Sequence, residues 1–294
     1  MVKPTMLVTY FKGMMMGAAD IIPGVSGGTI ALITGIYEDL IFALSRLFDA
    51  DTLRLLLKGQ WRAWWQRING RFLMSLMAGI LTSVFLLAKI ISWLFLHYPL
   101  MVWGFFFGLI AASGLFILNK WRIGRAADLL WVGMGASVAV FLAFMHPVGP
   151  VKGEVGWFFL LFSGALASIA MILPGISGSY ILILIGMYRY VLDKVHQMEI
   201  FPLLVFTAGV GLGLGGFSRM LRWLFARYEH RTMLLLGGFL LGSLAMVWPW
   251  KTDLRPVWPS AYPGNPEIAA VLAWVIAGFL LIWGIEKIAS RYGN

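Results

Sequence analysis

The chain has 294 residues, of which 60% are hydrophobic and only 12% are charged, and its mean hydropathy is +0.85. A soluble globular domain is about 45–50% apolar and about 25% charged, so this composition excludes an ordinary soluble domain and indicates a membrane protein. The chain has no cysteine, which excludes disulfides and thiolate metal sites. In a membrane protein, a net charge of +10 indicates Lys and Arg residues in cytoplasmic loops and in contacts with anionic lipids.

Eight apolar regions follow one another along the chain, and two of them are broken. Six are long enough to cross a bilayer as helices, and they cover residues 72–96, 99–119, 127–146, 203–221, 232–249 and 267–286. The other two, residues 10–48 and 157–192, are interrupted at Pro23-Gly24 and at Pro174-Gly175. Proline removes a donor and clashes with the preceding turn, so we predict two short helices in each region. Such breaks occur in a membrane only where protein buries them or where they line a wet cavity.

A basic linker, residues 46–71, separates the first broken region from the first span. We predict a helix that lies in the membrane interface, because basic side chains alternate with tryptophans. A nucleic-acid surface is the weaker alternative, and we predict no nucleic-acid partner. The residues concerned are Arg46, Arg54, Lys58, Trp61, Arg62, Trp64, Trp65, Arg67 and Arg71.

The two broken regions resemble each other. Residues 18–40 read AADIIPGVSGGTIALITGIYEDL and residues 169–191 read IAMILPGISGSYILILIGMYRYV. Pro23 corresponds to Pro174 at a spacing of 151 residues (174 − 23). The likeness continues at a spacing of 130 residues, where Lys89 corresponds to Arg219 (219 − 89). We infer that a whole half has been duplicated.

Each half holds one broken element and three spans. If the broken element is a re-entrant hairpin, the three crossings that follow place the second half upside down. With the N-terminus inside, the inner segments hold 16 Lys and Arg and the outer segments hold 5, as the positive-inside rule requires. The predicted fold is therefore an all-α polytopic membrane protein with an inverted repeat, residues 1–146 and 147–294. Both termini are expected to be cytoplasmic.

The first motif (residues 23–29) and the second motif (residues 174–180) are candidate anion sites. A broken helix presents free N–H groups and a positive dipole end at membrane depth, which is typical of transporters built from inverted repeats. The motif serines can cap the helices that follow, the glycines admit a ligand, and other hydroxyls can donate to it. The alternative is a tight turn whose glycines pack against neighbouring helices. The predicted phosphate-binding residues here are Ser26, Gly27, Gly28, Thr29, Ser177, Gly178, Ser179 and Tyr180.

Three charged residues near the spans are further candidates. Lys89 and Arg219, one in each half, can neutralise an anionic headgroup at the two faces, or can simply reach the lipid headgroups from span ends. Asp20 precedes the first break, and its counterpart is Met171. A carboxylate inside a membrane is a functional candidate, here for a coupling proton or sodium ion. The alternative is a polar helix end close to the inner surface.

Enzyme and metal motifs are absent from the sequence. There is no P-loop, no Gly-x-Ser-x-Gly elbow and no His-Glu-x-x-His. Ser26 has neighbours like those of a nucleophile, but no histidine is repeated near either motif. The four histidines lie far apart without metal-ligand spacing. We therefore predict a protein that is not an enzyme and that has no cofactor and no metal.

The segments DIIPGVSGGTIA (20–31) and LPGISGS (173–179) resemble the signature of the PopT-like polyprenyl-phosphate transporters. The resemblance extends from about residue 10 to 286. It implies translocation of undecaprenyl phosphate, the lipid carrier of cell-wall precursors, back to the inner face of the membrane. The expected partners are this lipid, other membrane lipids and a coupling ion. The alternatives are an ion-coupled small-anion symporter and a membrane enzyme that acts on lipid phosphates.

Overall fold

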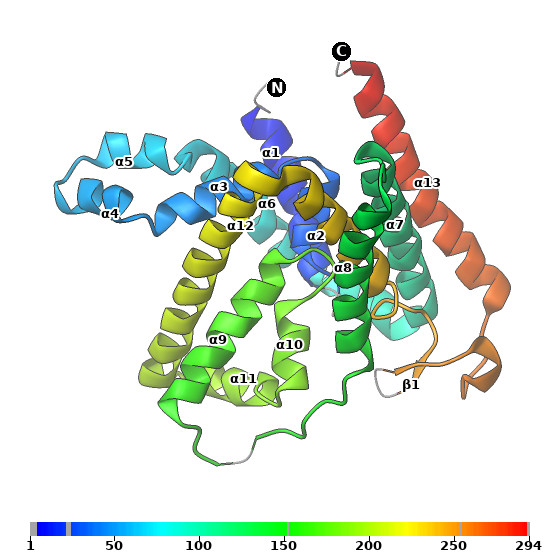
Figure 1. Ribbon diagram of the computed structural model, residues 1–294. Coiled ribbons are helices and arrows are strands. Elements are labelled where there is room, and N and C mark those ends of the chain that lie inside the picture. Colours follow the sequence, from blue (N-terminus) through cyan, green and yellow to red (C-terminus); the bar gives the residue numbers. More distant parts are fainter. Residues whose placement is uncertain (1–4, 22–24, 152, 253–254, 293–294) are drawn as a thin grey trace. The chain divides into compact units, whose positions relative to one another are not determined.

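The computed structural model describes residues 5–21, 25–151, 153–252 and 255–292. Its elements are helices apart from one short antiparallel strand pair, β1 (Lys251–Thr252) and β2 (Arg255–Pro256) (Figure 1). The helices are α1 (Met6–Asp20), α2 (Gly27–Ile33), α3 (Tyr37–Leu47), α4 (Ala50–Leu57), α5 (Trp61–Arg67), α6 (Gly70–His97), α7 (Pro99–Lys120), α8 (Ala126–Phe144), α9 (Trp157–Ile172), α10 (Gly178–Leu184), α11 (Tyr188–His196), α12 (Ile200–Ser243), the 3₁₀ helix η1 (Pro259–Ala261) and α13 (Ile268–Tyr292).

Four helices among the described residues, α6, α7, α8 and α12, are long and apolar enough to cross a membrane. This finding agrees with the predicted multi-pass membrane protein. The predicted spans 203–221 and 232–249 fall largely within α12, which consists of two helices that meet at a kink. Only the backbone of Tyr228 is non-helical (φ −139°, ψ 40°), and Tyr98, between α6 and α7, has nearly the same angles (φ −136°, ψ 50°).

Each broken region forms three helices and not the predicted two. The first contains α1, α2 and α3, and the second contains α9, α10 and α11. The additional breaks occur at Gly35 (φ +71°) and Gly186 (φ +73°). This left-handed conformation ends a helix and strongly favours glycine. The two glycines have the same spacing as the motifs, so the local course of the chain is the same in both regions.

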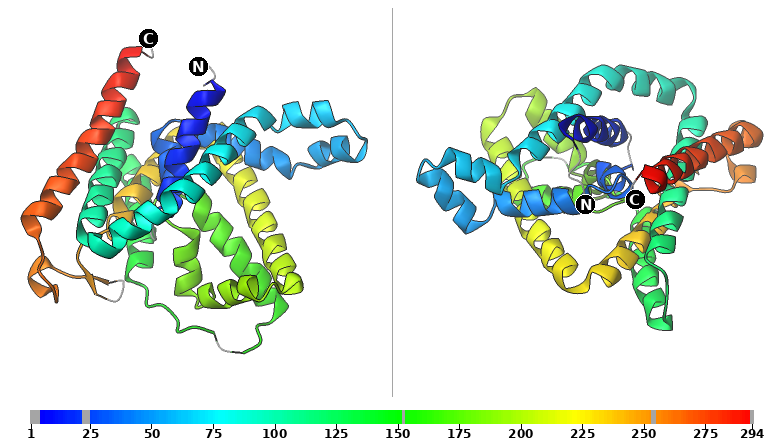
Figure 2. Two further views of the ribbon diagram at one scale, coloured as in Figure 1. Left: turned by 180° about the vertical axis from the view of Figure 1, so that it is seen from behind. Right: turned by 90° about the horizontal axis from the view of Figure 1, so that it is seen from above.

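The basic linker forms two helices, α4 and α5, where the sequence analysis predicted one. Gly59 (φ +67°) lies between them and turns the chain back. The two helices lie side by side and project from the helices around them (Figures 1 and 2). Leu57, Trp61 and Trp65 are exposed on this pair, as an interfacial element requires.

The chain divides into two compact units. Unit 1 contains residues 1–88 and 146–227, and unit 2 contains residues 89–145 and 228–294. The units do not coincide with the predicted halves, residues 1–146 and 147–294. Each unit instead combines a part of the first half with a part of the second.

Glycines bring the long helices of unit 1 into backbone contact. Four of them lie against a carbonyl oxygen of the opposite helix, where a Cβ would not fit. They are Gly13 against Leu76 and Gly79 against Tyr10, between α1 and α6, and Gly164 against Phe206 and Gly209 against Leu161, between α9 and α12. Small residues allow this close approach of membrane helices. Each contact of the first pair has a counterpart in the second at the two spacings found in the sequence.

Unit 2 has the same kind of contact. Its four closest approaches are Gly108 against Val275 and Gly278 against Phe105, between α7 and α13, and Gly238 against Val132 and Gly135 against Leu235, between α8 and the last part of α12. The pairs again correspond one to one, with α8 equivalent to α13. The sequence analysis had no counterpart for α8, because the likeness there lies in the glycine positions.

Candidate functional site

The first motif begins helix α2, and Ser26 caps it. The backbone of Ser26 is extended (φ −121°, ψ 134°), and its Oγ accepts a hydrogen bond from the N–H of Gly28 at 3.1 Å. An extended serine that accepts from the residue two positions on is the usual N-cap. This confirms the predicted capping role of Ser26. Pro23 and Gly24 lie outside the described residues.

The carboxylate of Asp20 also lies at the start of α2. Its Oδ1 accepts a hydrogen bond from the N–H of Gly27 at 2.6 Å. A Cβ on Gly27 would lie 2.6 Å from Oδ2 of the same carboxylate, so a larger residue does not fit. A negative group at a helix N-terminus is stabilised by the free N–H groups there. Asp20 therefore occupies the place where the sequence analysis expected a phosphate. Its counterpart in the second half, Met171, is uncharged.

The second motif begins helix α10 in the same way but is not capped by a side chain. Ser177 has the extended backbone of an N-cap (φ −97°, ψ 136°) without a capping hydrogen bond from its side chain. Its Oγ instead lies 2.8 Å from Oγ of Ser179. Gly175 precedes it in the left-handed region (φ +86°). From Ser26 and Ser177 onward, the two motifs thus share a backbone course, and they differ in their hydrogen bonds.

The first motif is bonded directly to the end of α9, the helix that leads into the second motif. Oγ of Ser26 lies 3.3 Å from the carbonyl oxygens of both Met171 and Leu173. The hydroxyl of Tyr37 donates to the carbonyl oxygen of Ile172 at 3.2 Å. The last carbonyl groups of a helix have no partner within the helix. Hydroxyl groups of the first half supply these partners.

A second contact joins the two motifs themselves. The N–H of Gly175 donates to Oγ1 of Thr29 at 2.7 Å. A Cβ on Gly28 would lie 2.6 Å from the carbonyl oxygen of Ile172. In this conformation, the predicted binding residues Ser26, Gly28 and Thr29 therefore all contact other residues of the same chain.

Burial separates the motifs further. Ser26 and Thr29 are 1% and 0% exposed, and every residue of α2 is buried. Gly178 and Ser179 are half-buried, while Ser177 and Tyr180 are buried. Polar groups are thus more accessible in the second motif than in the first.

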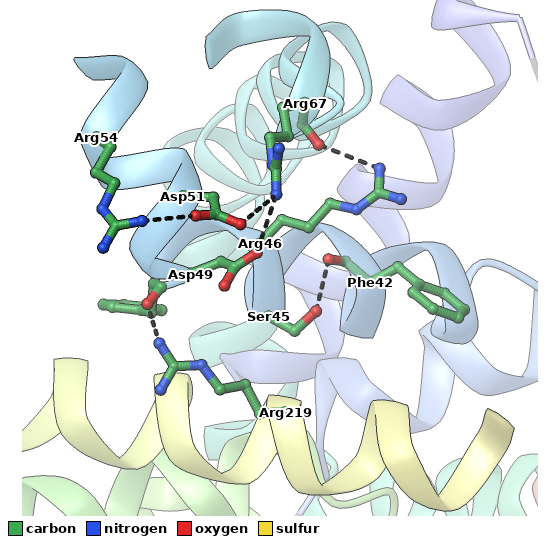
Figure 3. A network of polar contacts seen from close by, with 9 residues as sticks. Phe42, Ser45, Arg46, Asp49, Asp51, Arg54, Arg67 and Arg219 are labelled. Atoms are coloured by element: carbon green, nitrogen blue, oxygen red, sulfur yellow. Dashed lines mark hydrogen bonds and ion pairs between the residues drawn. The ribbon is translucent and has the colours of Figure 1, made fainter. Parts of the chain in front are cut away.

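The two predicted cations occupy different places. Arg219, on α12, donates through Nη2 to the carbonyl oxygen of Phe48, at the end of α3 (Figure 3). The contact satisfies a carbonyl group at a helix C-terminus, where a cation is favourable. Lys89 lies on α6 and belongs to unit 2. Arg219 is thus in the same unit as both motifs, and Lys89 is not.

Above Arg219, a cluster of charged side chains surrounds the start of α4 (Figure 3). Arg67 pairs with Asp49 at 3.3 Å and with Asp51 at 3.6 Å, and Arg54 pairs with Asp51 at 3.2 Å. Arg46 donates to the carbonyl oxygen of Arg67 at 3.2 Å. Exposed pairs of this kind contribute about 0–1 kcal/mol each. The cluster joins α3, α4 and α5 at the base of the projecting pair, a role that the sequence analysis did not assign to these arginines.

Comparison with known proteins gives the family. The family model for undecaprenyl phosphate translocase-like proteins matches residues 16–261. The chain belongs to this family. The matched range includes both motifs and the residues that form the contacts between them. It is a family of transporters and not of enzymes.

Two curated relatives of this translocase-like chain are both called polyprenyl-phosphate transporters. The protein from Vibrio cholerae is 46% identical over 97% of each chain. The protein from Staphylococcus aureus is 29% identical over 82% of this chain and 86% of its own length. No solved structure matches the chain.

In this translocase-like chain, sequence reasoning missed the roles of Tyr37 and of the Asp20–Gly27 contact. Tyr37 was visible as a repeated residue, since Tyr188 is its counterpart, but repetition alone gave it no function. Asp20 lies seven residues before Gly27, its hydrogen-bond donor, and no local sequence pattern predicts a contact at this spacing. No group of three or more metal-ligating side chains occurs among the described residues.

Proposed function

We propose that the chain translocates undecaprenyl phosphate across the bacterial cytoplasmic membrane and returns the carrier lipid to the inner face. The observation that carries the proposal is the 46% identity, over 97% of both chains, to a polyprenyl-phosphate transporter. The monophosphate headgroup is an anion that must pass the membrane, and the tail is apolar and remains in the lipid.

The proposed architecture is an inverted repeat of two halves, residues 1–146 and 147–294, each with a re-entrant hairpin and three spans. The one-to-one correspondence of the glycine contacts supports the duplication. Within unit 1, α1 and α9 run in opposite directions (Figure 1), which supports the inversion. The excess of basic residues in the inner segments supports cytoplasmic termini.

The proposed phosphate site consists of both motifs, Ser26 to Thr29 and Ser177 to Tyr180. In the described conformation the second motif offers the more accessible groups, so we expect the headgroup to contact Ser177 and Ser179 first. The first motif then joins the site when its contacts with α9 open. Rocking of one repeat against the other alternates access, as in other inverted-repeat transporters.

Three charged residues complete the proposal. Lys89 and Arg219 guide the headgroup, a role that rests on their matching positions in the two halves. Asp20 carries a coupling proton or sodium ion. Its contact with Gly27 supports this role, because uptake of a cation by the carboxylate weakens its hold on the N–H group that a phosphate needs.

The test is translocation of labelled undecaprenyl phosphate in proteoliposomes containing the purified protein. We expect lipid movement that depends on the protein and that soluble inorganic phosphate does not replace as cargo. Accumulation of inorganic phosphate without lipid movement would support a small-anion symporter instead. Release of phosphate from the lipid would support an enzyme.

A further inference from the structure

An apolar groove runs along unit 1 between α9 and the part of α12 that precedes Tyr228. Its volume is about 370 Å³, within the range of about 300–1,000 Å³ typical of ligand pockets. Every residue that lines it is apolar, an alanine or a glycine. The principal ones are Phe158, Phe162 and Ile169 on α9 and Gly216, Phe217 and Met220 on α12.

Gly216 is a residue of this groove that helix packing does not explain. It lies inside helix α12, where glycine is less favourable than alanine, and its backbone is not left-handed. A Cβ there would meet nothing within 4 Å. Gly213, one turn earlier, differs, because a Cβ on it would overlap with Ser168 and with the carbonyl oxygen of Ala165. The space beside Gly216 is therefore not needed for contact between helices.

The first half has larger residues at two of the corresponding positions. At the spacings of the repeat, Gly216 corresponds to Leu86, and Ala165, another residue lining the groove, corresponds to Met14. Both counterparts carry long apolar side chains at places where the second half has little or none. The two helix pairs thus differ in side-chain size at these two positions.

The groove leads toward the second motif. It follows α9 from Phe158 to Ile169, about 16 Å at 1.5 Å per residue. Ile169 lies four residues before Leu173, where α9 has ended and the second motif begins. Along α9, the groove therefore ends about one helical turn before the second motif, and a long chain attached to a polar group at that motif can extend into it.

We propose that this groove holds the isoprenoid tail of the transported lipid, next to its phosphate. The proposal rests on the proposed function and deepens it, because it assigns the tail to one half of the molecule. Gly216 and Ala165 then act as specificity-determining residues: their small size admits the branched prenyl chain, and the aromatic side chains of Phe162 and Phe217 form the walls.

The test replaces two residues of the groove by their counterparts in the first half. Gly216→Leu and Ala165→Met each introduce the residue of the corresponding position, and both fill the groove. We expect each to lower the translocation of undecaprenyl phosphate at limiting substrate about tenfold, which corresponds to about 1.4 kcal/mol. Gly133→Leu on α8 is the control, since Gly133 is also a helix glycine with open space beside it. The melting temperature in detergent shows whether a variant is folded.

A photoreactive polyprenyl phosphate, with a diazirine in the first isoprene units, reports the position of the tail directly. We expect its label on α9 and α12 peptides of the wild type and a loss of label in Gly216→Leu. Equal displacement of the label by phosphatidylglycerol would show a general lipid groove and overturn the proposal. Unchanged transport and labelling in both filled variants would also overturn it. A wild type that does not move the lipid at all would contradict the proposed function itself.

Discussion

From Ser26 and Ser177 onward, the two motifs have the same backbone course but different hydrogen-bond partners. In the first, Asp20 and Ser26 take up the N–H groups at the start of α2, and the hydroxyls of Ser26 and Thr29 bond to the second half. In the second, no carboxylate is present at the corresponding position, and Ser177 and Ser179 bond to each other. The difference teaches that two similar sequences can differ in burial, with Ser26 closed in by contacts and Ser179 left half-buried.

The largest effect is expected for Gly28→Val in the first motif. Gly28 is buried against the carbonyl oxygen of Ile172, so the added side chain must displace α9. Forced packing of this kind costs about 1–3 kcal/mol, and we expect a loss near the upper limit. Thermal unfolding of the purified protein in detergent measures it. Gly133→Val is the control, because Gly133 has open space beside it. Equal melting temperatures in the two variants would contradict tight packing of Gly28 against α9.

The next largest effect distinguishes the hydroxyl residues of the two motifs by their roles in transport and in stability. We expect Ser177→Ala with Ser179→Ala to lower transport about tenfold with little change in melting temperature, because their hydroxyls bond mainly to each other. Ser26→Ala with Thr29→Ala should instead lower the free energy of unfolding by about 2 kcal/mol, since it leaves the buried N–H of Gly175 without its acceptor. Transport and melting are measured on the same preparations. The reverse pattern would assign headgroup binding to the first motif.

A smaller effect is expected when the charge difference between the motifs is exchanged. Asp20→Asn keeps an acceptor for the N–H of Gly27 but removes the negative charge, so we expect transport to lose its dependence on an ion gradient. Met171→Asp gives the second motif a carboxylate and should raise the half-saturating concentration of lipid phosphate about threefold, an effect of under 1 kcal/mol. Transport with and without imposed proton and sodium gradients measures both. An ion dependence that survives in Asp20→Asn would reject the coupling role.

The smallest effect is expected for Arg219. Its side chain is exposed and caps the end of α3, so Arg219→Ala should cost about 0.5–1 kcal/mol of stability. Arg219→Lys retains the charge and should retain transport if the residue guides an anion. A transport loss in Arg219→Ala that Arg219→Lys does not rescue would show that the cap, and not the charge, matters. Lys89→Ala provides the matching measurement in the first half.

Local features of the fold followed from the sequence. The helices after the motifs begin at the residues following Ser26 and Ser177, as predicted, although only Ser26 caps its helix with its side chain. The breaks at Gly35 and Gly186 were equally local but were not used, although both glycines were visible in the repeat. Residues 222–231 separate two predicted spans, and in the structure they are helical except for the kink at Tyr228.

The contacts between the motifs could not be predicted in this way. The bonds from Gly175 to Thr29 and from Ser26 to α9 join residues about 145 positions apart. Only tertiary packing brings them together, and a single sequence carries no direct signal of it. The sequence likewise indicated an anion site at both motifs, without showing that Asp20 already lies at one of them.

The glycine contacts of unit 1 have a mechanical consequence. Where α1 meets α6 and α9 meets α12, the backbones touch at the four glycines, so no side chain at these points has to change rotamer when one helix shifts along its partner. Sliding of packed helices is one of the ordinary ways in which domains rearrange. We therefore expect a methyl group added at any one of the four glycines to hinder movement within its own helix pair and to leave the other pair unaffected.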